Sequence, residues 1–379
     1  MLFLSQRVLR FALRPTTVPT LHNLLHNLIE PANLVRHFQA HPPEGFSTVD
    51  VNGGAPAFSA PFDLLTTVDP PLRRRLDRWP FARRWRRFLH ATTCFVGTTV
   101  SEYVLLPDTP APEQLVRELL AELAPRYPFL IIKDLPTEAT LAGEAACAFS
   151  RGVAAVCSKE GFVLVDGQAL AYVQIDFAST DEFLSTLSHT RRRNVRRKLK
   201  SASRMVIEEL RTGHAYFSDE TRLRELYELY LNVYRQSDLH FDLLTPAFFR
   251  AVLQDGNMGG VVFTYRVDGA LIGFNFCVFR ESMLIDKYVG FAYPQSRHYN
   301  LYAVSWFHNL EYALAHGFHY YVAGWTDPEI KREFGARFTF TEHAVYVRNP
   351  VLRTLLRPFK RLFEADRRWQ DASVSIAHS

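Results

Sequence analysis

The stretch ALIGFNFCVFRESMLIDKYVGF, residues 270–291, consists of two apolar runs joined by the polar pair Arg280-Glu281. Both runs are rich in the β-branched and aromatic residues that favour strands. A third such run, 259–267, precedes them across Asp268-Gly269, a dipeptide typical of a two-residue hairpin turn. The sequence therefore predicts three consecutive antiparallel strands, with Arg280-Glu281 as the second turn.

Helical patterns flank these strands. Residues 220–237 have apolar side chains at helical spacing, and residues 245–254 begin with Thr245 as N-cap and Pro246 as first helical residue. The elements predicted after the strands are a helix over 300–317 that ends at Gly317, a strand over 319–324, a short helix within 327–335 and a strand over 338–348. The second half thus has the order helix, helix, three strands, helix, strand, helix, strand.

The first half is predicted to form a smaller α/β unit. Its expected elements are a strand over 93–107, a helix over 111–127, a strand over 128–136 and a hairpin over 161–177. The Asp166-Gly167 dipeptide is the turn signal for that hairpin.

Composition is that of an ordinary globular protein, with 379 residues, 47% hydrophobic and 22% charged residues and a net charge of +5. This length allows two domains or one large one. The four cysteines have no CxxC spacing, which indicates reduced thiols in a cytoplasmic protein and argues against a structural zinc ion. No run of 18 or more apolar residues is present, so we expect no transmembrane segment.

Residues 179–202 are predicted to form one helix with Ser179 as its N-cap. Within it, HTRRRNVRRKL (189–199) contains five arginines and a lysine. Arg191 falls on the apolar stripe between Leu187 and Val195, where an arginine needs an anionic ligand or a buried acid as partner. The basic run is therefore either part of a site for phosphates or a solvated helix face.

Three further segments combine basic and apolar residues. Residues 72–90 interleave eight arginines with aromatic side chains, as in nucleic-acid binding surfaces or in a helix whose arginines lie at the rim of a core. Residues 349–370 are basic and amphipathic, and are expected to contact an anionic membrane surface or to dock on the protein. Residues 1–15 have the composition of a transit peptide or of a surface helix.

The succession of elements in the second half resembles the GNAT acyltransferase fold, and its details resemble the FemAB-like branch, which includes peptidoglycan-biosynthesis-like acetyltransferases. The stretches that carry the resemblance are DEFLSTLSHTRRRNVRRKLKSA, DGALIGFNFCVF, DKYVGF, NLYAVSWFHNLEYALAHGF and AGWTDPEIKREFGARF. In the last of these, a glycine follows a strand and Lys331 stands three residues before Phe334-Gly335, similar to the branch's closing pattern.

This resemblance implies an α/β (α+β) GNAT-like fold of two GNAT-type lobes, with mixed, mainly antiparallel sheets and flanking helices. The expected domains are an extension over 1–92, a degenerate lobe over 93–178, an acyltransferase lobe over 179–348 and a basic tail over 349–379. The implied activity is transfer of an acyl or aminoacyl group to an amine, from acyl-CoA, an acyl carrier protein or aminoacyl-tRNA.

The chain departs from the GNAT pattern at the loop that usually binds the donor's pyrophosphate. Arg297 is in register with that loop, but Asn300 and Tyr302 occupy positions where glycine and a small residue are usual. Asn300 tolerates a left-handed backbone and can still form a turn, whereas Tyr302 would crowd a pyrophosphate. This substitution puts the use of ordinary acetyl-CoA in question.

Two residues are candidates for catalysis. Asp286 lies inside an apolar strand, where aspartate is disfavoured, and is either the general base or one partner of a salt bridge with Lys287. Tyr288 is either an acid that donates a proton or a core aromatic residue. The residues expected to hold donor phosphates or an acidic acceptor are Arg191, Arg192, Arg297, Asn300 and Lys331.

The sequence thus predicts a cytoplasmic N-acyltransferase that acts by direct attack, with an acyl-CoA or carrier-protein donor and no metal. Two alternatives are an aminoacyl-tRNA-dependent ligase of the FemAB-like kind and a catalytically inactive GNAT scaffold that binds an anionic partner. Expected partners are the donor and an amine-bearing acceptor, with tRNA, an acyl carrier protein or a peripheral membrane contact as further alternatives.

Overall fold

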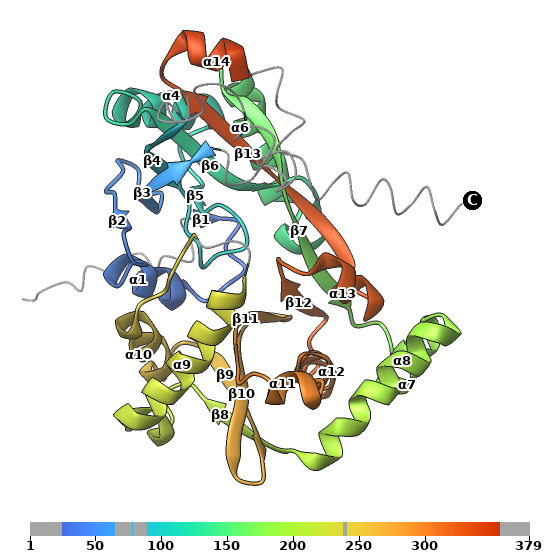
Figure 1. Cartoon of the computed structure of the whole chain (residues 1–379). Helices are drawn as coiled ribbons and strands as arrows, with labels where there is room; N and C mark the ends of the chain where they lie inside the picture. Colours follow the sequence, from blue (N-terminus) through green and yellow to red (C-terminus); the bar gives the residue numbers. More distant parts are fainter. Residues whose placement is uncertain (1–24, 65–77, 79–88, 238–240, 357–379) are drawn as a thin grey trace, which may run out of the picture.

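The computed structural model describes residues 25–64, 78, 89–237 and 241–356 (Figure 1). The basic segment 72–90, apart from Arg78, Leu89 and His90, the N-terminal residues 1–15 and most of the tail 349–379 lie outside the described residues. The described helices are α1 (Ala32–Ala40), α4 (Pro112–Leu123), α5 (Ala139–Ala142), α6 (Glu144–Lys159), α7 (Thr180–Thr186), α8 (His189–Leu199), α9 (Glu220–Gln236), α10 (Pro246–Gln254), α11 (Gln295–His298), α12 (Leu301–Ala315), α13 (Pro328–Glu333) and α14 (Pro350–Leu356), with 3₁₀ turns η3 (Lys200–Arg204) and η4 (Ala215–Ser218).

One mixed, mainly antiparallel sheet of eleven strands runs through the described chain, in the order β2-β3-β4-β6-β13-β7-β12-β11-β10-β9-β8. Its strands are β2 (Ser47–Thr48), β3 (Ala57–Asp63), β4 (His90–Val96), β6 (Phe129–Pro136), β7 (Val163–Gln174), β8 (Val206–Arg211), β9 (Gly260–Val267), β10 (Ala270–Arg280), β11 (Met283–Phe291), β12 (Tyr320–Gly324) and β13 (Arg337–Val347). The short strands β1 (Leu25–His26) and β5 (Leu106–Pro107) pair separately.

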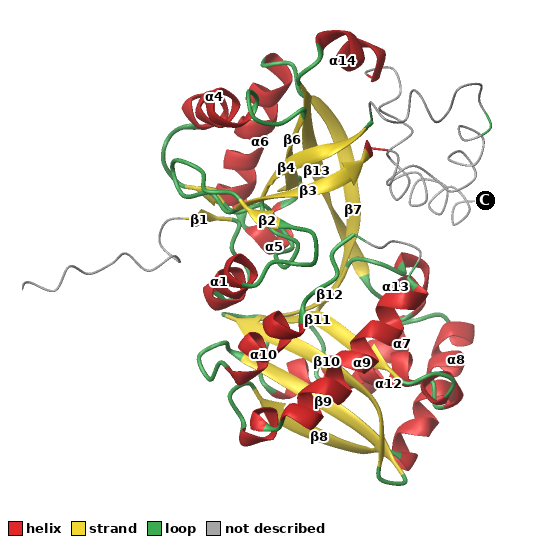
Figure 2. Ribbon diagram, turned by 60° about the vertical axis from the view of Figure 1, so that its left-hand side comes forward, coloured by secondary structure: helices red, strands yellow, loops and turns green. Residues whose placement is uncertain are grey.

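Helices cover the sheet in two lobes, which Figure 2 shows one above the other with β7 running between them. In the upper lobe, α4 and α6 pack on β4 and β6 through residues such as Leu119 and Val153. In the lower lobe, α9 and α10 cover one face of β9–β11, and α12 covers the other with Phe307 and Leu310. This is the predicted α/β fold of two GNAT-like lobes. None of the described helices has the length and apolar character needed to cross a membrane.

The three strands β9, β10 and β11 form the predicted antiparallel meander. Asp268 and Gly269 both have positive φ, at 49° and 81°, as their hairpin turn requires. The second turn lies one residue later than predicted. Arg280 still pairs with Met283 in the ladder, so the loop is Glu281-Ser282, with Glu281 in the left-handed region.

The hairpin predicted over 161–177 is wrong, because β7 is one continuous strand through Asp166-Gly167. A hairpin would pair the two halves with each other, but here β13 pairs along both halves from Val163 to Tyr172. The register shifts by one residue at Phe340–Glu342, opposite Asp166. The turn signal therefore marks an irregularity in a strand that β13 keeps paired on both sides of Asp166-Gly167.

The strand predicted over 93–107 is also wrong over most of its length. β4 ends at Val96, and Gly97 follows with φ at 123°. The next residues form a buried loop in which the Thr98 side chain accepts hydrogen bonds from the backbone N–H groups of Val100 and Ser101. This loop places Glu102 between the two lobes.

The single helix predicted over 179–202 is two helices. Ser179 caps α7 as predicted, since its hydroxyl accepts a hydrogen bond from the Glu182 N–H at 3.1 Å. Leu187 then adopts an extended backbone, and Ser188 provides a second N-cap for α8. A second serine cap thus interrupts the helical pattern that the apolar stripe predicts.

Candidate active site

The sheet opens where β11 leaves β12. The two strands pair in parallel only over Met283–Ile285 and Tyr320–Val322, and beyond Ile285 only β10 continues beside β11. Lys287 is an extra residue in β11 at this point, because Cys277 lies opposite Asp286 while Phe276 lies opposite Tyr288. The bulge therefore turns Asp286 and Tyr288 to opposite faces of the sheet.

Asp286 faces α12 and accepts three hydrogen bonds. Its Oδ1 accepts from Asn275 Nδ2 at 2.8 Å, and its Oδ2 accepts from Asn309 Nδ2 at 3.3 Å and from the Tyr321 hydroxyl at 3.2 Å. Burial raises the pKa of Asp286 to about 6, although the Asn275 hydrogen bond and the charge of Lys331 act in the opposite direction. The carboxyl is thus held in place and titrates near neutrality.

Lys331 on α13 is 4% exposed and lies close enough to Asp286 for the two charges to interact. Its ammonium group donates to the backbone carbonyl of Gly324 at 3.1 Å and also to that of Trp325, both at the carboxyl end of β12. Burial lowers the pKa of Lys331 to about 8, and the Asp286 carboxylate opposes this change. The structure thus brings together the predicted base and the predicted lysine.

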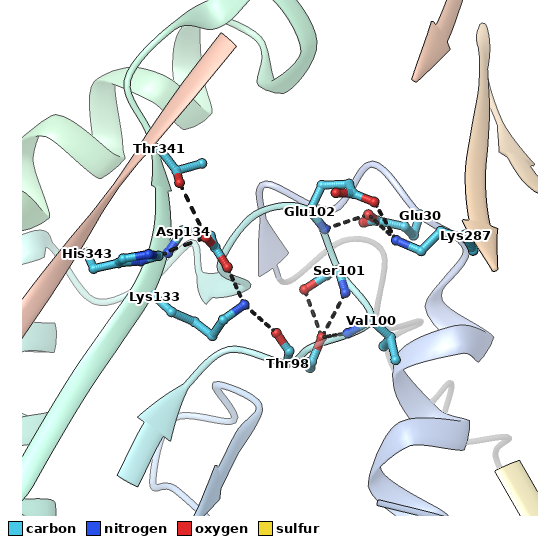
Figure 3. Close-up of polar contacts among 10 residues, drawn as sticks. All are labelled: Glu30, Thr98, Val100, Ser101, Glu102, Lys133, Asp134, Lys287, Thr341 and His343. Atoms are coloured by element: carbon cyan, nitrogen blue, oxygen red, sulfur yellow. Dashed lines mark hydrogen bonds and ion pairs between the residues drawn. The ribbon is translucent and has the colours of Figure 1, made fainter. Parts of the chain in front are cut away.

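A second buried ion cluster lies beside Asp286 and joins the two lobes; we call it the Glu30–Glu102–Lys287 cluster (Figure 3). Lys287 Nζ donates to Glu102 Oε1 at 2.6 Å and lies 3.6 Å from Glu30 Oε1. The backbone N–H of Glu102 donates to the same Glu30 oxygen at 2.7 Å. Burial acts against the charge of Lys287, but the two carboxylates still raise its pKa.

A third polar group braces the upper lobe around Asp134, as Figure 3 shows. Lys133 donates to the Thr98 carbonyl at 2.8 Å and pairs with Asp134, whose other oxygen accepts from the Thr341 hydroxyl at 3.3 Å. His343 accepts from the Asp134 N–H at 2.9 Å, and burial lowers the pKa of its imidazole. These bonds fix the loop that carries Glu102 against β6 and β13.

Tyr288 lies apart from Asp286, on the face covered by α9 and α10. Its ring packs in an edge arrangement against Phe248, 6.1 Å away, and is stacked on Phe276 at the same distance. The structure therefore does not bring the two residues predicted to be catalytic into one site.

The predicted phosphate-binding residues fall into two groups. Arg191 pairs with Glu333 at 3.3 Å, which links α8 to the helix that carries Lys331, and Arg192 donates to the Ser185 carbonyl at 3.3 Å. Arg297 donates to Gln236 at 3.2 Å, near the start of α12. The acid that pairs with Arg191 is half exposed, so this arginine needs no buried partner.

Asn300 precedes α12 with φ at 52°, so the left-handed turn that its side chain tolerates is formed. Its amide donates to the Ser201 hydroxyl at 3.4 Å, in the η3 turn. Leu301 and Tyr302 then pack into the core on the α12 face of the sheet. The side chains at the start of α12 thus contact other residues of the chain, although none of them caps the helix.

Several polar residues of the site were not predicted from the sequence. Asn275 and Asn309 are fully buried; Asn275 interrupts an apolar strand, the same signal that identified Asp286, while Asn309 lies in a largely apolar helix. Glu30 and Glu102 had no such signal, because Glu102 lies in a segment wrongly predicted to be a strand and no element was predicted around Glu30.

Comparisons with known proteins agree with this architecture. A FemAB-like family model, described as peptidoglycan biosynthesis/recognition, matches residues 132–373. No curated protein sequence matches the chain. The C-terminal domain of a candidate lysylphosphatidylglycerol synthetase from Agrobacterium fabrum is similar in structure, with a TM-score of 0.51, 12% identity, and coverage of 86% of this chain and 88% of that one.

Two further solved structures are similar. L-PGS from Bacillus licheniformis has a TM-score of 0.51 and 10% identity, over 89% of this chain and 98% of that one. FemX has a TM-score of 0.49 and 13% identity, over 86% and 98%. At such identities the likeness to L-PGS and to the Agrobacterium domain concerns the fold alone. Since the family model spans well over half of its residues, this chain belongs to the FemAB-like family.

Proposed function

We propose that this protein transfers an acyl or aminoacyl group from an activated donor to an amine by direct attack. The observation that supports it most is the buried pair Asp286 and Lys331 beside the opening between β11 and β12. Burial shifts the pKa values of both groups toward neutrality, to about 6 and about 8, as acid–base catalysis near pH 7 requires.

In the proposed reaction, the amine nitrogen attacks the donor's carbonyl carbon and forms the new C–N bond. The ionised carboxylate of Asp286 accepts the proton that the nitrogen loses, and the Lys331 ammonium stabilises the oxyanion. The carbonyl then re-forms, the C–O or C–S bond breaks, and the leaving oxygen or sulfur takes a proton from Lys331. Transfer of the proton from Asp286 to Lys331 restores both groups.

The donor is either an acyl thioester, such as acyl-CoA or an acylated carrier protein, or an aminoacyl ester on tRNA. The start of α12 supports the aminoacyl ester as the donor. CoA enzymes have a glycine loop at this position. Here Leu301 and Tyr302 pack into the core instead, and Asn300 bonds to Ser201. In either case Arg191, Arg192 and Arg297 are the proposed contacts for donor phosphates. The family description points to a cell-wall precursor as the source of the acceptor amine.

The test is thermal stabilisation and single-turnover transfer with acetyl-CoA, longer acyl-CoAs and charged tRNA, using wild type and Lys331→Met. We expect one donor class to raise the melting temperature of both proteins. Transfer to an amine should fall by at least about a hundredfold in Lys331→Met only, since the oxyanion loses its donor. Lys159→Met, at the exposed end of α6, is the matched control.

Two results would contradict the proposal. Donor binding with no transfer by wild type would support the catalytically inactive scaffold, and no response to any of these donors would exclude acyl-CoA and charged tRNA. Transfer that survives Lys331→Met would remove the lysine from the mechanism.

A further inference from the structure

The Glu30–Glu102–Lys287 cluster has more hydrogen-bond acceptors than donors. Lys287 and the Glu102 backbone N–H both direct their hydrogen atoms at the Oε1 atoms of the two glutamates. The Oε2 atoms of Glu30 and Glu102 are buried and have no hydrogen-bond partner within the described part of the chain. The two side chains are 0% and 3% exposed, so these oxygens are well removed from bulk solvent.

Tyr288, the residue after Lys287, provides a third buried acceptor. Its hydroxyl is buried and has no hydrogen-bond partner among the residues that the structure describes. Burial raises the pKa of Tyr288 well above its usual value, and the negative charges of Asp242, Glu102 and Glu30 are close enough to add to this. Two carboxylate oxygens and one hydroxyl, all buried, thus have lone pairs that no described residue uses.

The cluster is also unbalanced in charge. It contains two carboxyl groups and one ammonium group, all buried. Burial raises the pKa of Glu30, and the Glu102 carboxylate adds to this while Lys287 opposes it. A buried carboxylate is costly unless it is paired and hydrogen-bonded, so Glu30, whose pKa burial raises to about 7, takes up a proton near neutral pH unless a second cation replaces it.

We propose that this cluster binds a protonated primary amine of the substrate. An ammonium group has three N–H donors, no acceptor and one positive charge, which suits two buried carboxyl groups that share one lysine and have unpaired Oε2 atoms. A divalent metal ion fits less well because Lys287 lies within the cluster. The described residues also contain no group of three metal-ligating side chains.

The cluster lies next to the proposed catalytic pair Asp286 and Lys331. The inference therefore rests on the proposed function. Lys287 directly follows Asp286, and the charge of Glu102 acts on Lys331. An amine held as an ammonium ion by two carboxylates is not a nucleophile, so it differs from the amine that attacks. It is therefore either the α-ammonium group of an aminoacyl donor or a second, unreactive ammonium group of the acceptor.

Calorimetric titration of the full chain tests this with two pairs of probes. The donor pair is 3′-alanylamino-3′-deoxyadenosine and its propionylamino counterpart, which lacks the ammonium group. The acceptor pair is Nα-acetyl-lysine amide and Nα-acetyl-norleucine amide. In the pair that represents the true source, we expect wild type to bind the ammonium probe at least about tenfold more tightly than the neutral one.

Glu102→Gln and Glu30→Gln, which keep the shape of each side chain, are expected to reduce this preference to about twofold or less, since each removes one negative charge. The matched control is Glu281→Gln, an exposed acid on the turn before β11, which should keep the full preference. Melting temperatures show whether each variant is folded, and Glu30→Gln alone suffices if Glu102→Gln does not fold.

Equal binding of both members in both pairs, or no binding at all, would overturn the inference. A lower melting temperature with an unchanged preference in both glutamate variants would also overturn it, because the cluster would then have only a structural role. Since the titration needs no turnover, a preference for ammonium without any transfer would contradict the proposed function and leave this site standing.

Discussion

Asp286 and Lys331 show how burial prepares two ordinary side chains for acid–base chemistry. Each is removed from water, and each has a charged neighbour that only partly offsets the cost of ionisation. Asp286 is also held by amide groups from β10 and α12, so its orientation does not depend on the charge of Lys331. The pair can therefore change protonation state without losing its geometry.

We expect kcat/KM for transfer to have a bell-shaped dependence on pH. Activity requires ionised Asp286, so it should fall as the pH drops below about 6, and it requires protonated Lys331, so it should fall as the pH rises above about 8. The two values belong to the pair, because the groups interact. Initial rates across this range test the prediction, with stability measured at each pH. A flat profile between about pH 5 and 9 would contradict it.

Sequence reasoning reached part of this site and not the rest. Asp286 could be identified because a charged residue interrupts an apolar strand, and Lys331 because it matches a family pattern. Glu102 could not, because the alternating residues around it resemble a strand while the structure has a loop there. Its partner Glu30 is distant in sequence, and only tertiary packing shows that they meet.

At the scale of elements, local sequence signals predicted a helix correctly where no second signal or strand pairing competed with them. The apolar spacing of residues 220–237, the Thr245 cap of α10 and the glycine that ends α12 predicted these helices to within a residue or two. Asp166-Gly167 misled because hydrogen bonds to β13 outweigh a local turn preference. A single apolar stripe over α7 and α8 concealed the second cap at Ser188.

Helix α8 presents basic side chains to solvent, with Arg193 and Arg197 both exposed. If the donor is tRNA, replacing both with glutamate should weaken tRNA binding by about tenfold or more. The slope of log affinity against log salt concentration should also become less steep, by the amount that corresponds to about two phosphate contacts. Filter binding at several salt concentrations measures both effects. Arg224→Glu, exposed on α9, is the control, and equal weakening in the control would show a general charge effect.

At the scale of the molecule, the Glu30–Glu102–Lys287 cluster joins the lobes by buried charges. Lys287→Met would leave two buried carboxyl groups without a cation and should lower the free energy of unfolding by about 3–5 kcal/mol at pH 8. The loss should shrink as the pH falls, because the carboxyl groups then become neutral.

Chemical denaturation at pH 8 and pH 5 measures these changes. The triple variant Lys287→Met, Glu30→Gln, Glu102→Gln should recover much of the loss at pH 8, since it buries no unpaired charge. If the triple variant is as unstable as Lys287→Met, the effect comes from packing and not from charge.

The order of strands has a consequence for how this chain folds as it is synthesised. β13 lies between β6 and β7 in the sheet, although about 160 residues of sequence separate the end of β7 from the start of β13. Until β13 leaves the ribosome, β6 and β7 each have an open edge of unpaired backbone groups. The upper lobe therefore cannot close during the early part of translation, and nascent chains interrupted before Arg337 should be the species most prone to aggregate.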